Sequence, residues 1–164
     1  MVSRRKGPLR AWRIADNRHP LFDGTGAMIR GGRWNSPGHA VIYATSSFSC
    51  AMLECLANTG TGRIPKDHCW IAIDISKIDI EVIDRSDVPG WDNPDRNASQ
   101  AYGDRWIVEK RTAVLMVPST VADGEDYNIL INPAHPDSTT ITCTSPKPVK
   151  WDYRLFRSGP SKKS

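Results

Sequence analysis

Three side chains that could act together on a ligand follow one another over a short stretch of the sequence, namely Arg33, Tyr43 and Glu54. Gly31 and Gly32 precede the arginine; paired glycines let the backbone approach a ligand and adopt positive φ angles, so the planar guanidinium could be offered to an anion. The ring of Tyr43 can stack on a flat base while its hydroxyl group reaches a polar atom. Glu54 falls at the edge of a helix's apolar arc, from which its carboxylate can face a cleft.

Each of these residues also has an ordinary structural explanation. The glycine pair can be a simple turn, Arg33 a surface charge, Tyr43 half-buried packing and Glu54 a solvated helix residue. Single short motifs are weak evidence of function, and taken alone each residue favours the ordinary explanation. The combination on successive elements is what favours a shared ligand site.

A second group of short polar side chains accompanies two apolar strands near the C-terminal end: Ser119, Asn128, Asn132 and His135. Such groups could hydrogen-bond a ribose or an amide, but Asn-Pro and His-Pro also form turns, and locally the turn is favoured. A histidine could titrate near neutral pH, yet no Ser/His/Asp set or second histidine at metal spacing accompanies His135. We therefore interpret it as a turn residue.

The elements that must position these side chains form an α+β pattern. A helix is expected over 47–58, where a serine can cap the N-terminus, and another over 98–110. Strands outnumber helices and no βαβ alternation is visible, which favours mixed or antiparallel sheets over a doubly wound parallel sheet. Neither G-x-G-x-x-G nor G-x-x-x-x-G-K-[ST] is present, so a nucleotide would be bound without these devices. The runs typical of strands are 11–14, 41–44, 69–75, 80–83, 113–117, 128–131 and 139–143.

The length of 164 residues and the 39% hydrophobic content predict one domain with one real core. We expect this domain over 9–157, with flexible tails at 1–8 and 158–164. No apolar run is long enough for a transmembrane helix and no signal peptide is recognisable, so we expect a cytoplasmic protein. The four cysteines have no metal-binding spacing and are expected to be reduced and mostly buried.

The net charge of +4 does not predict nucleic-acid binding. The charge is concentrated at the two ends, so that the body of the domain is nearly neutral and lacks a basic stripe with interleaved aromatics. A non-catalytic module that binds nucleic acid through its basic tails ranks last among the functional hypotheses. The basic residues at the ends are Arg4, Arg5, Lys6, Lys162 and Lys163.

The sequence resembles the RES domain along nearly its whole length. The family's characteristic arginine, glutamate and serine occur in order with their flanking patterns. The segments that carry the resemblance are Trp12-Arg13, Phe22-Asp23-Gly24 with Gly26-Ala27, Gly31-Gly32-Arg33-Trp34-Asn35, Val41-Ile42-Tyr43-Ala44, Ala51-Met52-Leu53-Glu54, Val117-Pro118-Ser119 and Ile131-Asn132-Pro133-x-His135-Pro136.

The resemblance implies a toxin of a type II toxin–antitoxin pair with an ADP-ribosyltransferase-like fold. Such toxins consume NAD⁺ by hydrolysis, by phosphorolysis or by transfer of ADP-ribose to a protein, and destruction of free NAD⁺ ranks above transfer. No metal cofactor is expected, because the leaving nicotinamide is already a cationic pyridinium. The implied partner is an Xre-type helix-turn-helix antitoxin that covers the active site and binds any DNA, and homo-oligomerisation within that complex is left open. Neither nucleic acid nor a membrane is expected to bind the toxin directly.

The resemblance also assigns the site. It implies Glu54, Arg33 and Tyr43 as catalytic residues, with Glu54 stabilising positive charge on the ribose and orienting the nucleophile. Arg33 and Arg13 would bind phosphate oxygens, and Tyr43 would pack on nicotinamide or its ribose. Ser119 and Asn132 would hold polar edges of the substrate. These expectations concern the chemistry of one shared pocket.

Overall fold

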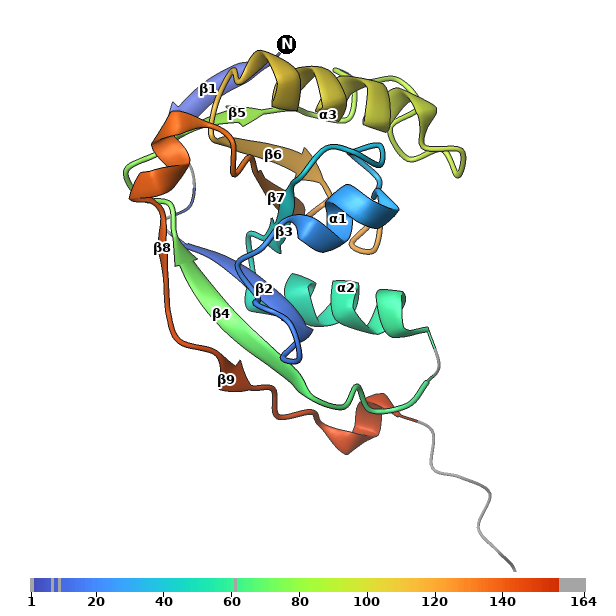
Figure 1. Ribbon diagram of the computed structural model, residues 1–164. Coiled ribbons are helices and arrows are strands. Elements are labelled where there is room, and N and C mark those ends of the chain that lie inside the picture. Colours follow the sequence, from blue (N-terminus) through green and yellow to red (C-terminus); the bar gives the residue numbers. More distant parts are fainter. Residues whose placement is uncertain (1, 7, 9, 61, 157–164) are drawn as a thin grey trace, which may run out of the picture.

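The computed structural model describes residues 2–6, 8, 10–60 and 62–156. These residues form a strongly bent mixed sheet with the strand order β1-β5-β6-β7-β3-β2-β4-β8, and β9 pairs with β4 off this path (Figure 1). The strands are β1 Ser3–Lys6, β2 Arg10–Asp16, β3 Ile42–Thr45, β4 His68–Asp74, β5 Asp79–Val82, β6 Val114–Pro118, β7 Tyr127–Ile131, β8 Thr142–Cys143 and β9 Lys147–Pro148.

Three α-helices lie against this sheet: α1 Thr25–Arg30, α2 Phe48–Thr59 and α3 Asn97–Glu109. In Figure 1, α3 lies across the top beside β5, α2 lies below beside β2, and α1 lies between these two helices. Two short 3₁₀ helices, Pro136–Thr140 and Tyr153–Leu155, occur in the C-terminal part. No helix in the described ranges has the length and apolar character needed to cross a membrane.

The sheet has a seam between β2 and β3. Each of these strands pairs extensively on its outer side, β2 with β4 over seven residue pairs and β3 with β7 over four. Between themselves, however, only Trp12 and Thr45 are paired. Because the two strands diverge beyond this bridge, a gap opens in the middle of the sheet.

Apolar side chains pack on both faces of the sheet. One core cluster includes Ile71, Ile73, Ile80 and Ile131, and the other contains Trp34, Trp106, Leu115 and Leu130 beneath α3. Gly103 on α3 permits this second contact, since a Cβ atom there would lie 1.8 Å from the backbone oxygen of Trp34. The absence of a side chain at position 103 therefore sets how closely α3 approaches the segment that carries Arg33.

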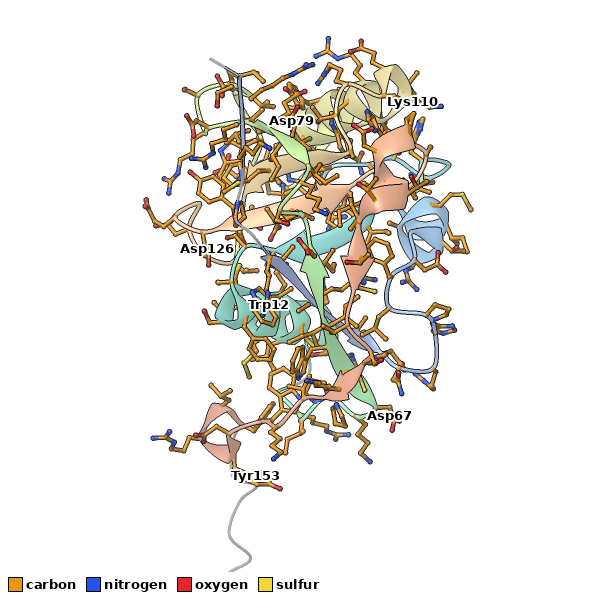
Figure 2. All side chains as sticks on the ribbon, turned by 90° about the vertical axis from the view of Figure 1, so that its left-hand side faces the viewer. Trp12, Asp67, Asp79, Lys110, Asp126 and Tyr153 are labelled. Atoms are coloured by element: carbon orange, nitrogen blue, oxygen red, sulfur yellow. The ribbon has the colours of Figure 1, made fainter. Side chains whose placement is uncertain are left out.

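Helix α2 is capped by the serine that its sequence predicts and ends one residue beyond the expected range. The side-chain oxygen of Ser47 accepts a hydrogen bond from the backbone nitrogen of Cys50 at 3.1 Å, and Gly60 ends the helix with a φ of 59°. Phe48 on its first turn packs edge-on against Trp12 of β2 and Trp70 of β4, with centroid distances of 5.5 Å in both pairs. Trp12 is labelled in Figure 2, in front of α2. These contacts fix the helix against the half of the sheet beyond the seam.

The expected α+β class, both expected helices and most of the expected strands are confirmed, whereas helix α1 was not expected and the strands differ as follows. Ser3–Lys6, which we expected within a flexible tail, forms β1 and pairs with β5, while 158–164 lies outside the described residues. Strands β5 and β6 are parallel and joined through α3, a crossover that the long connection between them concealed. The expected strand 139–143 begins with the last two residues of a 3₁₀ helix, and only its last two residues form a strand, β8.

Candidate active site

A cavity of about 770 Å³ opens at the seam between β2 and β3. Its walls come from β2, α1, the turn 31–33, β3 and α2, together with Arg96, residues 120–121 and Asn128 of β7. This volume falls within the usual range for sites that hold small ligands and cofactors. Four of the six residues that the family resemblance assigns to the site contribute to its lining: Arg13, Arg33, Tyr43 and Glu54.

Glu54 lies on the second turn of α2 and is half-buried. Its Oε1 atom accepts hydrogen bonds from the hydroxyl group of Ser119 at 3.0 Å and from Nδ2 of Asn128 at 2.9 Å. Its Oε2 atom accepts no hydrogen bond within the described ranges. The carboxylate is therefore held from one side, with its second oxygen left for a ligand.

The hydroxyl group of Tyr43 is fixed by two hydrogen bonds, one that it donates and one that it accepts. The hydroxyl group donates to Oδ1 of Asn35 at 2.7 Å and accepts from the backbone nitrogen of Trp34 at 3.1 Å. Burial raises the pKa of Tyr43 well above its usual value, although the hydrogen bond from Trp34 opposes this rise. The phenol therefore stays protonated, and its ring, rather than its oxygen, is what Tyr43 can offer to a ligand.

Arg33 lies in the turn between α1 and β3 and reaches toward the segment before α3. Its Nη1 atom donates to the backbone oxygens of Trp91 at 3.2 Å and Asn93 at 3.0 Å. Burial lowers the pKa of Arg33, and the charge of Arg96 lowers it further, whereas the charges of Asp92 and Glu54 act in the opposite direction. Positive charge thus gathers at this end of the cavity, where it could bind an anion.

Arg13 bridges the seam. Its side chain extends from β2 and donates through Nη1 to the backbone oxygen of Tyr43 at 2.7 Å, where the β2–β3 ladder has already ended. Nε donates to the backbone oxygen of Leu21 at 2.6 Å. Burial lowers the pKa of Arg13, partly offset by the charge of Asp23. The guanidinium therefore supports the cavity wall, and only its Nη2 atom has no partner in the part of the chain described.

The two remaining predicted residues lie elsewhere than expected. Ser119 is fully buried behind Glu54, with its hydroxyl group on the carboxylate and the Cys50 thiol 3.7 Å away. Asn132 is fully buried and lies outside the cavity lining, bonded to the backbone of Ile107 and Ala134. The family resemblance implied that both would hold polar edges of the substrate, whereas here Ser119 holds Glu54 and Asn132 satisfies backbone groups.

A family model described as the RES domain matches residues 10–152. The chain belongs to the RES domain family. The match covers all but the two ends of the described structure and contains every residue of the cavity.

Curated relatives of this RES domain bear the names of toxins. "Prs ADP-ribosylating toxin" of Sphingobium sp. (strain YBL2) is 36% identical over 155 residues, which is 89% of this chain and 96% of that protein. "Toxin Res" of Yersinia enterocolitica is 34% identical over 137 residues, 82% of this chain and 90% of that protein. The chain thus spans nearly the full length of both relatives.

Among solved structures, a chain of the M. tuberculosis MbcT–MbcA toxin–antitoxin complex is similar to this RES domain, with a TM-score of 0.73. The likeness covers 87% of this chain and 84% of that chain at 17% sequence identity. At this identity the likeness bears on the fold alone. It confirms the predicted ADP-ribosyltransferase-like α+β arrangement.

Two residues of the site escaped the sequence analysis. Arg96 lines the cavity of the RES domain from a left-handed conformation, with φ 61°, just before α3. Asn128 was noted only as a polar group near a strand end, but it contacts Glu54 directly. Neither could be placed from the sequence, because each reaches the site through an element far from Arg33 and Glu54 along the chain.

Proposed function

We propose that this RES domain is the toxin of a toxin–antitoxin pair and that it cleaves the bond between nicotinamide and ribose in NAD⁺. The observation that carries the proposal is the convergence of Arg33, Tyr43 and Glu54 on one cavity of about 770 Å³. Four arginines, Arg13, Arg30, Arg33 and Arg96, line the same space. A dinucleotide with a diphosphate, a ribose and a flat cationic ring matches this set of side chains.

Glu54 would act on the reacting ribose. When the bond between the anomeric carbon and the nicotinamide nitrogen breaks, the electron pair leaves with nicotinamide and positive charge develops on the ribose. A fixed carboxylate beside that carbon stabilises the charge, and Oε2 of Glu54 is the oxygen left for this role. An acceptor oxygen then bonds to the anomeric carbon and loses its proton. No metal ion is invoked, because nicotinamide departs as a neutral molecule.

The other cavity residues would hold the substrate still. Arg33 and Arg96 would bind phosphate oxygens at the positively charged end, and Arg13 would contribute its Nη2 atom. The ring of Tyr43, held by Asn35 and Trp34, would pack against nicotinamide or its ribose. Positioning of this kind supplies a large part of the rate in reactions of bound substrates.

A second candidate keeps the cavity but makes the acceptor a protein, so that ADP-ribose is transferred. The name of the Sphingobium relative, "Prs ADP-ribosylating toxin", favours this candidate. Water, phosphate and a protein side chain would all attack the same carbon. The products therefore separate the two candidates, and the cavity residues do not.

An antitoxin would cover the cavity, and the Xre type remains the expectation from the family resemblance. The solved structure with the similar fold is a toxin–antitoxin complex. In this chain, apolar side chains are exposed on the two helices that flank the cavity: Met28 and Ile29 on α1 are 38% and 68% exposed, and Leu53 on α2 is 47% exposed. Exposed apolar groups beside a cavity support a protein partner there. A toxin that consumes the cell's NAD⁺ would act in the cytoplasm.

The experiment is to incubate the purified protein with labelled NAD⁺, with and without phosphate and with cell extract. Free ADP-ribose or its phosphate ester indicates destruction of NAD⁺, and labelled protein bands indicate transfer. Glu54→Gln and Arg33→Ala should abolish either product while the protein stays folded. Glu125→Gln is the matched control, because Glu125 is an exposed carboxylate paired with Arg85 outside the cavity. Unchanged NAD⁺ loss in the Glu54→Gln protein would refute the proposal.

A further inference from the structure

Asn128 lies on β7 opposite Thr45 of β3 and Val117 of β6. Asparagine is disfavoured inside strands, because it lacks the branched or aromatic shape that packs on a sheet surface. Its position in the middle of the sheet therefore needs an explanation other than strand formation.

The hydrogen bonds of Asn128 are incomplete. Nδ2 donates to Oε1 of Glu54 at 2.9 Å, but Oδ1 is buried and has no partner in the described part of the chain. Asn132, also buried, uses both ends of its amide: Nδ2 donates to the backbone oxygen of Ile107 and Oδ1 accepts from the backbone nitrogen of Ala134. A buried acceptor without a partner destabilises a fold, so Asn128 does not serve stability as Asn132 does.

The contact with Glu54 fixes which way the amide of Asn128 points. A reversed amide would set Oδ1 against a carboxylate oxygen, and two acceptors repel. The Ser119 hydroxyl group donates to the same Oε1 atom at 3.0 Å, and the Cys50 thiol donates to that hydroxyl at 3.7 Å. Two donors on one oxygen hold the carboxylate in a single rotamer with Oε2 turned away from them.

We infer that Asn128 is a positioning residue, kept at a cost in stability because it orients the Glu54 carboxylate for catalysis. The inference depends on the proposed function in one respect, namely that Glu54 is the catalytic carboxylate. The contact itself and its effect on stability stand apart from that function.

The first test uses Asn128→Val, which suits a strand and removes the unpaired acceptor. We expect a melting temperature equal to or above that of the unmutated protein, while kcat falls between about tenfold and a hundredfold, the rate equivalent of one hydrogen bond to a charged group. KM should stay within about twofold, because the substrate's own contacts remain. A lower melting temperature with unchanged kcat would overturn the inference.

Thr112→Val is the matched control. Thr112 is buried two residues before the start of β6, away from the cavity lining. Its hydroxyl group accepts from Trp106 and donates to the backbone oxygen of Val114. This substitution should lower the melting temperature and leave kcat unchanged. If both variants changed stability and kcat in the same direction, Asn128 would be an ordinary structural residue.

The second test is Asn128→Asp, which keeps the shape and removes the donor. Near neutral pH the new carboxylate faces Glu54, and kcat should fall at least as far as in Asn128→Val. At acidic pH a proton shared between the two carboxyl groups replaces the lost donor, so the ratio of variant to unmutated activity should rise as pH falls. A ratio independent of pH would contradict a role through Glu54.

The third test needs no catalysis. The side-chain amide signals of Asn128 in a ¹⁵N–¹H NMR spectrum are assigned by their loss in Asn128→Val, and we expect Glu54→Gln to shift them. If the chemical shifts of these signals were the same in the Glu54→Gln protein, the contact between Asn128 and Glu54 would be refuted. Failure of the unmutated protein to consume NAD⁺ would refute the proposed function separately, while these signals would still decide whether Asn128 holds Glu54.

Discussion

The hydroxyl group of Tyr43 occupies the space that a side chain at position 32 would need. A Cβ atom added to Gly32 would lie 2.6 Å from the Tyr43 hydroxyl oxygen and 3.0 Å from Oδ1 of Asn35. Both are partners in the hydrogen bond that fixes Tyr43. The glycine before Arg33 is therefore required by the tyrosine on the next strand.

Gly32→Ala should displace the Tyr43 ring and destabilise the protein by about 1–3 kcal/mol, the usual cost of overpacking. NAD⁺ consumption should fall with it, because Tyr43 lines the cavity. The check is denaturant unfolding together with the activity assay. Combining Gly32→Ala with Tyr43→Phe removes the closest clash, so if the two losses of stability simply added, the steric explanation would be wrong.

Arg111→Met should cost about 3–5 kcal/mol of unfolding free energy, because it leaves a buried carboxylate without its cation. The Glu81 side chain is 3% exposed and accepts from Nε and Nη2 of Arg111 at 3.1 and 3.0 Å. Tyr102 donates to the same carboxylate at 2.6 Å. Chemical denaturation measures the loss.

The double variant Glu81→Met/Arg111→Met is the control for Arg111→Met. Since it removes both charges, it should be more stable than the single variant. A double variant as unstable as the sum of two single losses would show that the pair matters through packing and not through charge.

Asp126 should contribute stability that is lost in acid. Although burial opposes its charge, hydrogen bonds from Ser46 and Ser47 lower the pKa of Asp126. A carboxyl group whose pKa is lower in the folded state stabilises the fold above its unfolded pKa of about 3.9, and this contribution disappears as pH falls through the folded value. Asp126→Asn should therefore flatten the dependence of melting temperature on pH below about 4. If the melting temperatures of the unmutated protein and of Asp126→Asn fell in parallel with pH, this prediction would be contradicted.

Cys143 should be the thiol that reacts fastest with an aromatic disulfide reagent in the folded protein. It is exposed, whereas Cys50, Cys55 and Cys69 are buried, and all four cysteines are free. Burial also raises the pKa of Cys50 and of Cys55 to about 11, so little thiolate is present at neutral pH. Stopped-flow absorbance measures the rates. Cys143→Ser should remove the fast phase, and a fast phase that persists would point to local opening around a buried cysteine.

The sequence was sufficient for those features that depend on local patterns. The spacing of apolar residues on α2 predicted the helix and left Glu54 at the edge of its apolar side, where the structure has it half-buried beside the cavity. The serine before the helix caps it as expected. The shared cavity of Arg33, Tyr43 and Glu54 was expected from their combination, and their catalytic roles remain a prediction.

Features that depend on long-range pairing escaped prediction. Strand β1 has no apolar pattern, because all four of its residues are exposed and it is held by backbone pairing with β5. Helix α1 buries none of its residues fully and so gives no periodic signal. The family resemblance implied Asn132 at the site, but its amide lies inside and bonds the backbone of Ile107 and Ala134.

Because β2 and β3 pair only through Trp12 and Thr45, the cavity between them depends on how these two strands are paired. If β2 and β3 paired over a few more residues, the two halves of the sheet would join without a gap, and the cavity beside Glu54 would be lost. The cavity is thus encoded in the register of two strands.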